Sequence, residues 1–126
     1  AWIAGCGRDV VVVLHANHPT EIDPAVAAAC ERLRTAGCLL FNQAVLLRGV
    51  NDDAATLARL SRRLARCGVV PYYLHALDPV AGAAHFAVAD DRAAIMRDLH
   101  ADLPGYLLPR LVREVAGEPG KRHLAW

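Results

Sequence analysis

Three apolar segments, each followed by a segment with helical periodicity, constrain the fold of this chain more than any other feature of its sequence. The first apolar segment is a continuous β-branched run, which is typical of a strand buried on both faces in a parallel sheet. The predicted caps of the helical segments are Asp23, then Asn51 or Asp52, then Asp90 or Asp91, and glycines follow the first two segments. We predict strands and helices in alternation, in chain order at about residues 9–14, 24–36, 38–47, 51–67, 69–74 and 90–103.

Alternation of strands and helices with short connections predicts βαβ units and a parallel sheet. Three such units are visible, fewer than the eight of a closed barrel. A short extended piece at 107–108 and an uncertain segment at 110–116 follow in a C-terminal tail. We therefore expect an α/β fold and a single domain over residues 1–126, either an arc of a (β/α) barrel or a small open sheet.

Composition and charge exclude several classes of protein. Hydrophobic residues make up 55% of the 126 residues, which favours a packed core over a disordered chain. The formal net charge is +1, from 14 basic and 13 acidic residues, and gives no support to nucleic-acid or membrane-surface binding. No apolar run reaches the roughly 18 residues of a membrane span, and no signal peptide is predicted.

The cysteines and the first residue also bear on the class of protein. Cys6, Cys30, Cys38 and Cys67 match no zinc or cluster spacing, so we expect reduced thiols in a cytoplasmic protein. The chain starts at Ala1, without Met, and almost directly enters a strand. We take it to be a piece of a longer protein.

Polar side chains lie in or after each of the three predicted strands. Ligands of parallel α/β sheets bind at the carboxyl ends of the strands, so these side chains are candidates for one site. Taken singly, each is more often a capped or satisfied core residue, and an adjacent pair within a strand points to opposite faces unless the strand ends or bulges. The candidates are His15, Asn17, His18, Asn42, Gln43, His75 and Asp78.

Two further features allow a chemical reading. His15 and His18 lie three residues apart in a loop, but no Cys or Glu completes a ligand set, so no protein-only metal site is expected. Lys121 is the only lysine among the 14 basic residues. It is either an exposed residue of a Pro-Gly loop or a Schiff-base lysine, a role that arginine does not serve, and spacing alone favours the exposed reading.

A succession of short motifs resembles a known family. The segments HANHPTEID, NQAVLLRGVND, PYYLHALD, GAAHF, GYLLP and EPGK, over about residues 10–123, are similar to the lysine 2,3-aminomutase family of radical S-adenosylmethionine enzymes. The similarity is greatest to the branch that isomerises lysine for modification of translation elongation factor P. The resemblance implies a partial (β/α) barrel holding a [4Fe-4S] cluster, S-adenosylmethionine and pyridoxal phosphate, of which this chain would be the C-terminal half.

The resemblance also implies roles for particular residues. Lys121 would hold pyridoxal phosphate, and His15, Asn42 and Gln43 would lie by S-adenosylmethionine. Asp78, and Glu114 where related enzymes carry an aspartate, would pair with the distant ammonium group of a lysine substrate. Carboxylates at a fixed distance from the cofactor would select lysine by its length.

Two departures from the family pattern matter. The Cys-x3-Cys-x2-Cys cluster motif is absent, so its ligands would lie outside this chain and the fragment alone would be inactive. Asp53 stands where free-lysine members have a zinc-binding cysteine, which favours the elongation-factor branch and removes zinc.

The expected function is therefore part of an isomerase that converts α-lysine to β-lysine. Its expected partners are lysine, the N-terminal half of the barrel and possible further copies of itself, with no nucleic acid or membrane. The alternatives are a non-catalytic remnant or binding module with the same half-barrel, and an ordinary barrel enzyme that uses Lys121 without radicals. An open half-barrel would expose an edge strand and part of its core, which predicts poor solubility in isolation.

Overall fold

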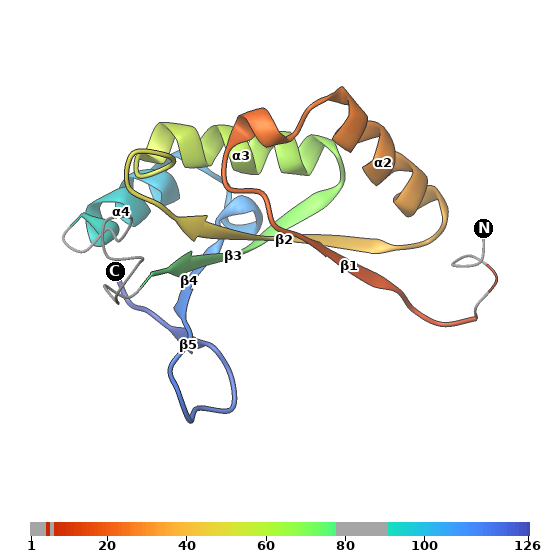
Figure 1. Ribbon diagram of the computed structural model, residues 1–126. Helices are drawn as coiled ribbons and strands as arrows, with labels where there is room; N and C mark the ends of the chain where they lie inside the picture. The colour runs from red at the N-terminus through yellow and green to blue at the C-terminus, as the bar shows by residue number, and fades with distance from the viewer. Residues whose placement is uncertain (1–4, 6, 78–90) are drawn as a thin grey trace.

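A mixed sheet with helices packed on one face forms the described part of the chain (Figure 1). The computed structural model describes residues 5, 7–77 and 91–126. The elements within these residues are β1 (Val11–Leu14), η1 (Pro19–Glu21), α2 (Pro24–Thr35), β2 (Leu39–Leu46), α3 (Ala54–Arg66), β3 (Val69–Ala76), α4 (Arg92–Asp102), η3 (Gly105–Leu107), β4 (Arg110–Arg113) and β5 (Arg122–His123).

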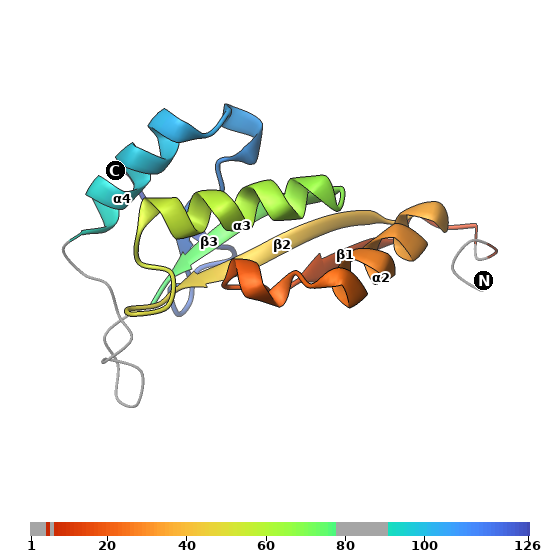
Figure 2. The ribbon, with the colours of Figure 1, turned by 90° about the horizontal axis from the view of Figure 1, so that it is seen from above.

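The sheet has the strand order β1-β2-β3-β4-β5, with β1 to β4 parallel and β5 antiparallel to β4. Figure 2 shows α3 between α2 and α4 over the same face of the sheet. The predicted α/β class is confirmed, and β1–α2, β2–α3 and β3–α4 are the three predicted βα units. One expectation was wrong: the extended piece predicted at 107–108 overlaps η3, and the next parallel strand is β4, inside the segment left uncertain.

Local capping explains where the helices begin. The Asp23 carboxylate accepts from the Val26 amide at 2.8 Å, with Pro24 in the first turn of α2. At α3 the cap is Asp53, not Asn51 or Asp52 as the sequence predicted. Its carboxylate accepts from the Thr56 amide at 2.7 Å and from the Thr56 hydroxyl at 2.8 Å, and these bonds lower the pKa of Asp53.

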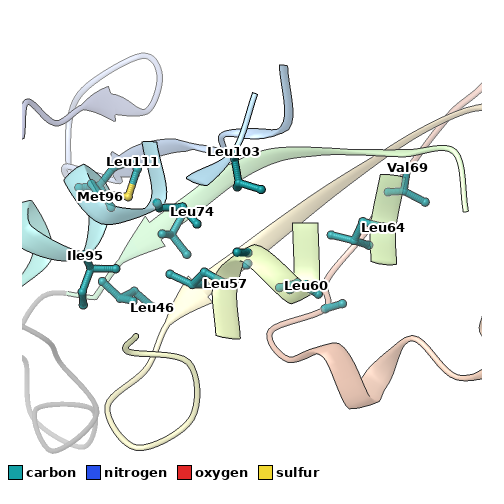
Figure 3. Close-up of a cluster of buried hydrophobic side chains, with 14 of the residues drawn as sticks. Leu46, Leu57, Leu60, Leu64, Val69, Leu74, Ile95, Met96, Leu103 and Leu111 are labelled. Carbon is teal, nitrogen blue, oxygen red and sulfur yellow. The ribbon is translucent and has the colours of Figure 1, made fainter. Parts of the chain in front are cut away.

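The core lies between the helices and the sheet (Figure 3). Helix α3 has a leucine at each turn of its inner face and arginines on its outer face, so its apolar stripe is narrow and continuous. On the outside, Arg62 forms an ion pair with Asp102 at 2.9 Å and links α3 to the end of α4. The buried side chains that meet here include Leu46, Leu57, Leu60, Leu64, Leu74, Met96 and Leu99.

A β-bulge interrupts β3 at its proline. Asn42 of β2 is opposite Pro71, but the next residue, Gln43, is opposite Tyr73, so Tyr72 is the additional residue. Pro71 has no N–H to give to the ladder, which explains why the irregularity falls there. Successive side chains of a regular strand point to opposite faces, yet the Tyr72 and Tyr73 rings have centroids only 4.0 Å apart. The bulge therefore places both rings on one face of the sheet.

Candidate active site at the carboxyl edge of the sheet

The carboxyl ends of the parallel strands surround a cavity of about 340 Å³. Each of the four parallel strands contributes at least one side chain, from its last residues or from the residue that follows it. This is the edge at which α/β proteins bind their ligands. The lining residues are His15, Gln43, Val45, His75, Ala76, Leu77, Arg113 and Glu114.

Gln43 and His75 meet across β2 and β3 in this cavity. His75 Nε2 lies 3.3 Å from Gln43 Oε1, a distance at which a proton on Nε2 is donated to the amide oxygen. Burial lowers the pKa of His75, and the charges of Lys121 and His15 lower it further. The charge of Glu114 raises it. His75 is therefore held in the neutral form near neutral pH.

The third strand extends further than the sequence predicted. β3 runs through Ala76, two residues past the predicted end, so His75 lies within the strand and not in the loop after it. Asn42 and Gln43 lie in the middle of β2, inside the strand predicted at 38–47, and not at its carboxyl end. The amide pair is therefore inside a strand and points to its two faces.

Asn42 lies on the helix side of the sheet, where both ends of its amide bond to Ala16. The Ala16 N–H donates to Asn42 Oδ1 at 2.9 Å, and Asn42 Nδ2 donates to the Ala16 carbonyl at 3.1 Å. Its side chain is buried and does not line the cavity. Of the two amides in this pair, only Gln43 faces the candidate site.

Asn17 and Asn51 fix the loop after β1 to the end of β2. The Val45 N–H donates to Asn17 Oδ1 at 2.9 Å, and Asn51 Nδ2 donates to the Asn17 and Val45 carbonyls, each at 2.8 Å. Asn51 Oδ1 also accepts from the Leu47 N–H at 2.8 Å. Asn51 is completely buried. The sequence predicted it as a helix cap, because Asn is common at caps and a helix starts beside it.

His18, another candidate from this loop, is the N-cap of η1. Its Nδ1 accepts from the Thr20 N–H at 3.2 Å, which caps the 3₁₀ turn. It does not line the cavity, whereas His15 does. Asp78, the remaining candidate, lies outside the described residues.

Glu114 and Lys121 pair at the side of the cavity. Glu114 follows β4 directly and lines both the main cavity and an adjoining one of about 260 Å³, formed with the loop before β5. Lys121 Nζ lies 3.3 Å from Glu114 Oε1 and 5.6 Å above the centroid of the Tyr73 ring. The Lys121 side chain is 24% exposed, so it is not the fully solvated lysine that a loop position favours.

Three residues at this site went unrecognised in the sequence. Arg113 lines the cavity from the end of β4, a strand too short to show a periodic pattern. Tyr73 reaches the site through the bulge, and Asn51 through its bonds to the loop after β1. In the sequence Asn51 stands between Val50 and Asp52 at a helix start, and nothing there distinguishes it from a helix cap.

The described residues limit what else the chain can hold by itself. Over residues 5, 7–77 and 91–126, no three His, Cys, Asp or Glu side chains come together as metal ligands. Cys30, Cys38 and Cys67 are free thiols. None of the helices within these ranges has the length and apolar character needed to cross a bilayer. A cofactor with an aldehyde suits the amine of Lys121, which lies beside a cavity and is ordered by Glu114 and Tyr73.

An α/β sheet whose parallel strands end in a polar cavity has the arrangement of the α/β enzymes. No family model matches the chain. Among curated proteins, L-lysine 2,3-aminomutase of Escherichia coli (strain K12) is 53% identical over 116 residues, which are 91% of this chain and 34% of the relative. L-lysine 2,3-aminomutase of Haemophilus influenzae is 51% identical over 112 residues, 88% and 33% of the two chains.

A third relative, the glutamate 2,3-aminomutase of Clostridioides difficile, is 37% identical over 116 residues, 91% of this chain and 28% of the relative. The chain belongs to the lysine 2,3-aminomutase family, as its motifs predicted. It spans about a third of the length of the curated relatives it matches.

Proposed function

We propose that this chain is the C-terminal half of a partial (β/α) barrel in a lysine 2,3-aminomutase, an isomerase that converts α-lysine to β-lysine. The observation that carries the proposal is the placement of Lys121, the only lysine of the chain, beside a cavity at the carboxyl edge of the sheet. A primary amine is required to attach pyridoxal phosphate, and arginine cannot replace it. The 51–53% identity to two L-lysine 2,3-aminomutases supports the same assignment.

The cofactors supply the difficult chemistry in this proposal. Pyridoxal phosphate supplies a π system that permits an amino group to migrate, while S-adenosylmethionine with a [4Fe-4S] cluster supplies the radical that removes a hydrogen. The cluster ligands would lie outside this chain. His15 and Gln43 line the main cavity and would be the described residues beside S-adenosylmethionine. Asn42, which the family resemblance also assigns there, would act indirectly, by holding the loop after β1 through its bonds to Ala16.

In this proposal the residues of the chain bind and orient the cofactors and the substrate. Lys121 would attach pyridoxal phosphate through its amine, which lies 3.3 Å from Glu114 Oε1. Gln43 keeps the imidazole of His75 in one orientation through Nε2. The Glu114 carboxylate would also bind the ammonium group of a lysine substrate.

Substrate choice follows from the charge of Glu114. A carboxylate attracts the ammonium end of lysine and repels the carboxylate end of glutamate. Glu114, with Asp78 as the family resemblance implies, therefore favours lysine over the substrate named for the Clostridioides difficile relative. Selection would act on the far end of the substrate, away from the reacting carbon atoms.

The proposal extends to the branch of the family that serves translation elongation factor P, whose product passes to the ligase that modifies this factor. Asp53 supports it, because it caps α3 with its carboxylate and so gives that position a role without zinc. The identity to the Escherichia coli relative, 53%, is also higher than the 38% to the Clostridium subterminale relative.

Reconstitution tests the proposed function. The protein that carries this chain is loaded with iron, sulfide, S-adenosylmethionine and pyridoxal phosphate, and β-lysine formed from α-lysine is measured by chromatography. We expect turnover in the unaltered protein, none in Lys121→Ala, and unchanged turnover in Arg32→Ala, an exposed position on α2. Pyridoxal phosphate bound without turnover would favour a remnant or binding module. Activity retained by Lys121→Ala would refute the assignment of Lys121.

A further inference from the structure

We infer that the ring of Tyr73 is a positioning element for Lys121 and His75, an inference that rests on the proposed function. Lys121 Nζ lies 5.6 Å over the ring centroid, within the range of a cation–π interaction. The His75 ring meets the same tyrosine edge to face, with centroids 5.9 Å apart. A third ring, His123 of β5, meets it at 6.3 Å. One aromatic ring therefore contacts two groups of the candidate site and the strand that follows Lys121.

The bulge in β3 brings Tyr73 to this place. With Pro71 opposite Asn42 and Tyr73 opposite Gln43, the ring of Tyr73 shares a face with Gln43 and His75. Without the additional residue, Tyr72 would be opposite Gln43 and every later side chain of the strand would change face. The bulge therefore puts Tyr73 beside Lys121.

The ring limits the freedom of two side chains that need a fixed direction. A lysine has four rotatable bonds and a compact charge, so a single exposed carboxylate such as Glu114 orders it weakly. The face of Tyr73 gives Lys121 a second partner from another direction. The edge-to-face contact with His75 fixes the plane of the imidazole, whose Nε2 meets Gln43 at 3.3 Å.

The ring and the hydroxyl of Tyr73 have separate roles. A hydrogen bond with Tyr72 raises the pKa of Tyr73, with burial adding to the effect, so the hydroxyl stays protonated. The contacts with Lys121 and His75 involve the aromatic ring itself. Phenylalanine at this position should therefore preserve the positioning, whereas an aliphatic side chain should not.

Binding of pyridoxal phosphate tests the inference without turnover. The full protein is titrated with pyridoxal phosphate, its attachment is followed by absorbance, and reduction with borohydride followed by peptide mass analysis locates the attachment at Lys121. We expect Tyr73→Leu and Tyr73→Met to weaken binding about two- to tenfold, which corresponds to the cost of immobilising one rotamer-rich side chain on binding. Tyr73→Phe should bind as the unaltered protein does. Phe41→Leu is the control, because Phe41 lies on the same face but contacts Tyr72.

Three outcomes would contradict the inference. Unchanged binding in both aliphatic variants, with the unaltered protein labelled at Lys121, would overturn the inference and leave the proposed function intact. Tyr73→Phe as weak as Tyr73→Leu would assign the effect to the hydroxyl and overturn it as well. No attachment at Lys121 in the unaltered protein would overturn both the proposed function and this inference.

A second measurement does not depend on the folding of a variant. In protein labelled at lysine, magnetisation transfer between the Tyr73 ring protons and the ε-methylene of Lys121 is expected in the unaltered protein. Its absence would overturn the inference whatever the variants do. Circular dichroism identifies which aliphatic variants are folded before their binding is compared.

Discussion

Lys121 Nζ lies 3.3 Å from Glu114 Oε1, so the only lysine of the chain is paired with the carboxylate that follows β4. The Glu114 side chain is 75% exposed, and such a pair contributes about 0–1 kcal/mol to stability. The pair therefore matters more for what Glu114 can bind than for the stability of the fold. It shows that Glu114 can bind a primary ammonium group at this edge of the sheet, and a lysine substrate would present the same group.

Neutralising Glu114 should weaken the use of lysine. We expect Glu114→Gln to raise the KM for lysine about fivefold, equivalent to the upper range of about 1 kcal/mol for an exposed ion pair. Glu118→Gln is the matched control, since Glu118 lies in the same loop but pairs with Arg122. Steady-state kinetics of the reconstituted protein check the prediction, and an unchanged KM in Glu114→Gln would remove Glu114 from the substrate site.

The pKa of His75 should respond to the charges around it in opposite directions. Lys121 lowers it and Glu114 raises it, after burial as the largest cause. Lys121→Met should therefore raise the pKa of His75 toward its ordinary value, and Glu114→Gln should lower it further. Titration of the imidazole signals by NMR checks both signs. Shifts of the same sign in the two variants would mean that His75 does not lie between these charges.

His75 should also make the protein less stable as the pH is lowered. The folded-state pKa of His75 is lowered, so the unfolded state binds the proton more readily, and the free energy of unfolding decreases as pH falls below about 6.5. His75→Gln should flatten this part of the curve. Asp53 acts in a separate, more acidic window, since its lowered pKa gives stability that is lost only as pH falls below about 3.8. Urea unfolding at a series of pH values separates the two windows, and an equal slope in His75→Gln would contradict the prediction.

The sequence predicted the alternation of elements well because periodicity reports burial. The apolar runs of β1, β2 and β3 and the leucine stripe of α3 depend on local pattern alone. β4 was missed because four residues with arginine at both ends give no clear alternation. The side of the sheet on which Tyr73 lies could not be predicted from local pattern either, because the bulge depends on which residue of β2 lies opposite Pro71. The site was predicted in part, for the same reason: strand position indicated His15 and Gln43, whereas partners distant in sequence determined the places of Asn42 and Asn51.

Asn42 and Asn51, which are buried, should contribute more to stability than Gln43, which faces the cavity. Asn42→Ala and Asn51→Ala each leave buried backbone groups without partners, at a cost of about 1–3 kcal/mol in the free energy of unfolding. Gln43→Ala should change it by only about 0.5 kcal/mol, because Gln43 is partly exposed. Denaturant titration of the three variants checks the order. Equal effects at Asn42 and Gln43 would show that the bonds to Ala16 contribute little.

The face of the sheet opposite the helices should make this 126-residue chain self-associate when it is produced alone. Val11, Val13 and Val70 are 40–51% exposed on it, and Leu39 is 60% exposed. Register pairs Val11 with Leu39, and places Val13 and Val70 on either side of Phe41, so the exposed apolar side chains are neighbours and not scattered.

Charges on that face should reverse the association. We expect the double variant Val13→Lys and Leu39→Lys to sediment as a smaller species than the unaltered chain, because each added charge would have to be desolvated on contact. Val50→Lys is the control, since Val50 is 38% exposed but lies in the turn after β2. Analytical ultracentrifugation over a range of concentrations provides the measurement. An unaltered chain that is monomeric throughout and melts cooperatively would contradict the prediction, and would mean that a third of the length of its relatives folds without the rest.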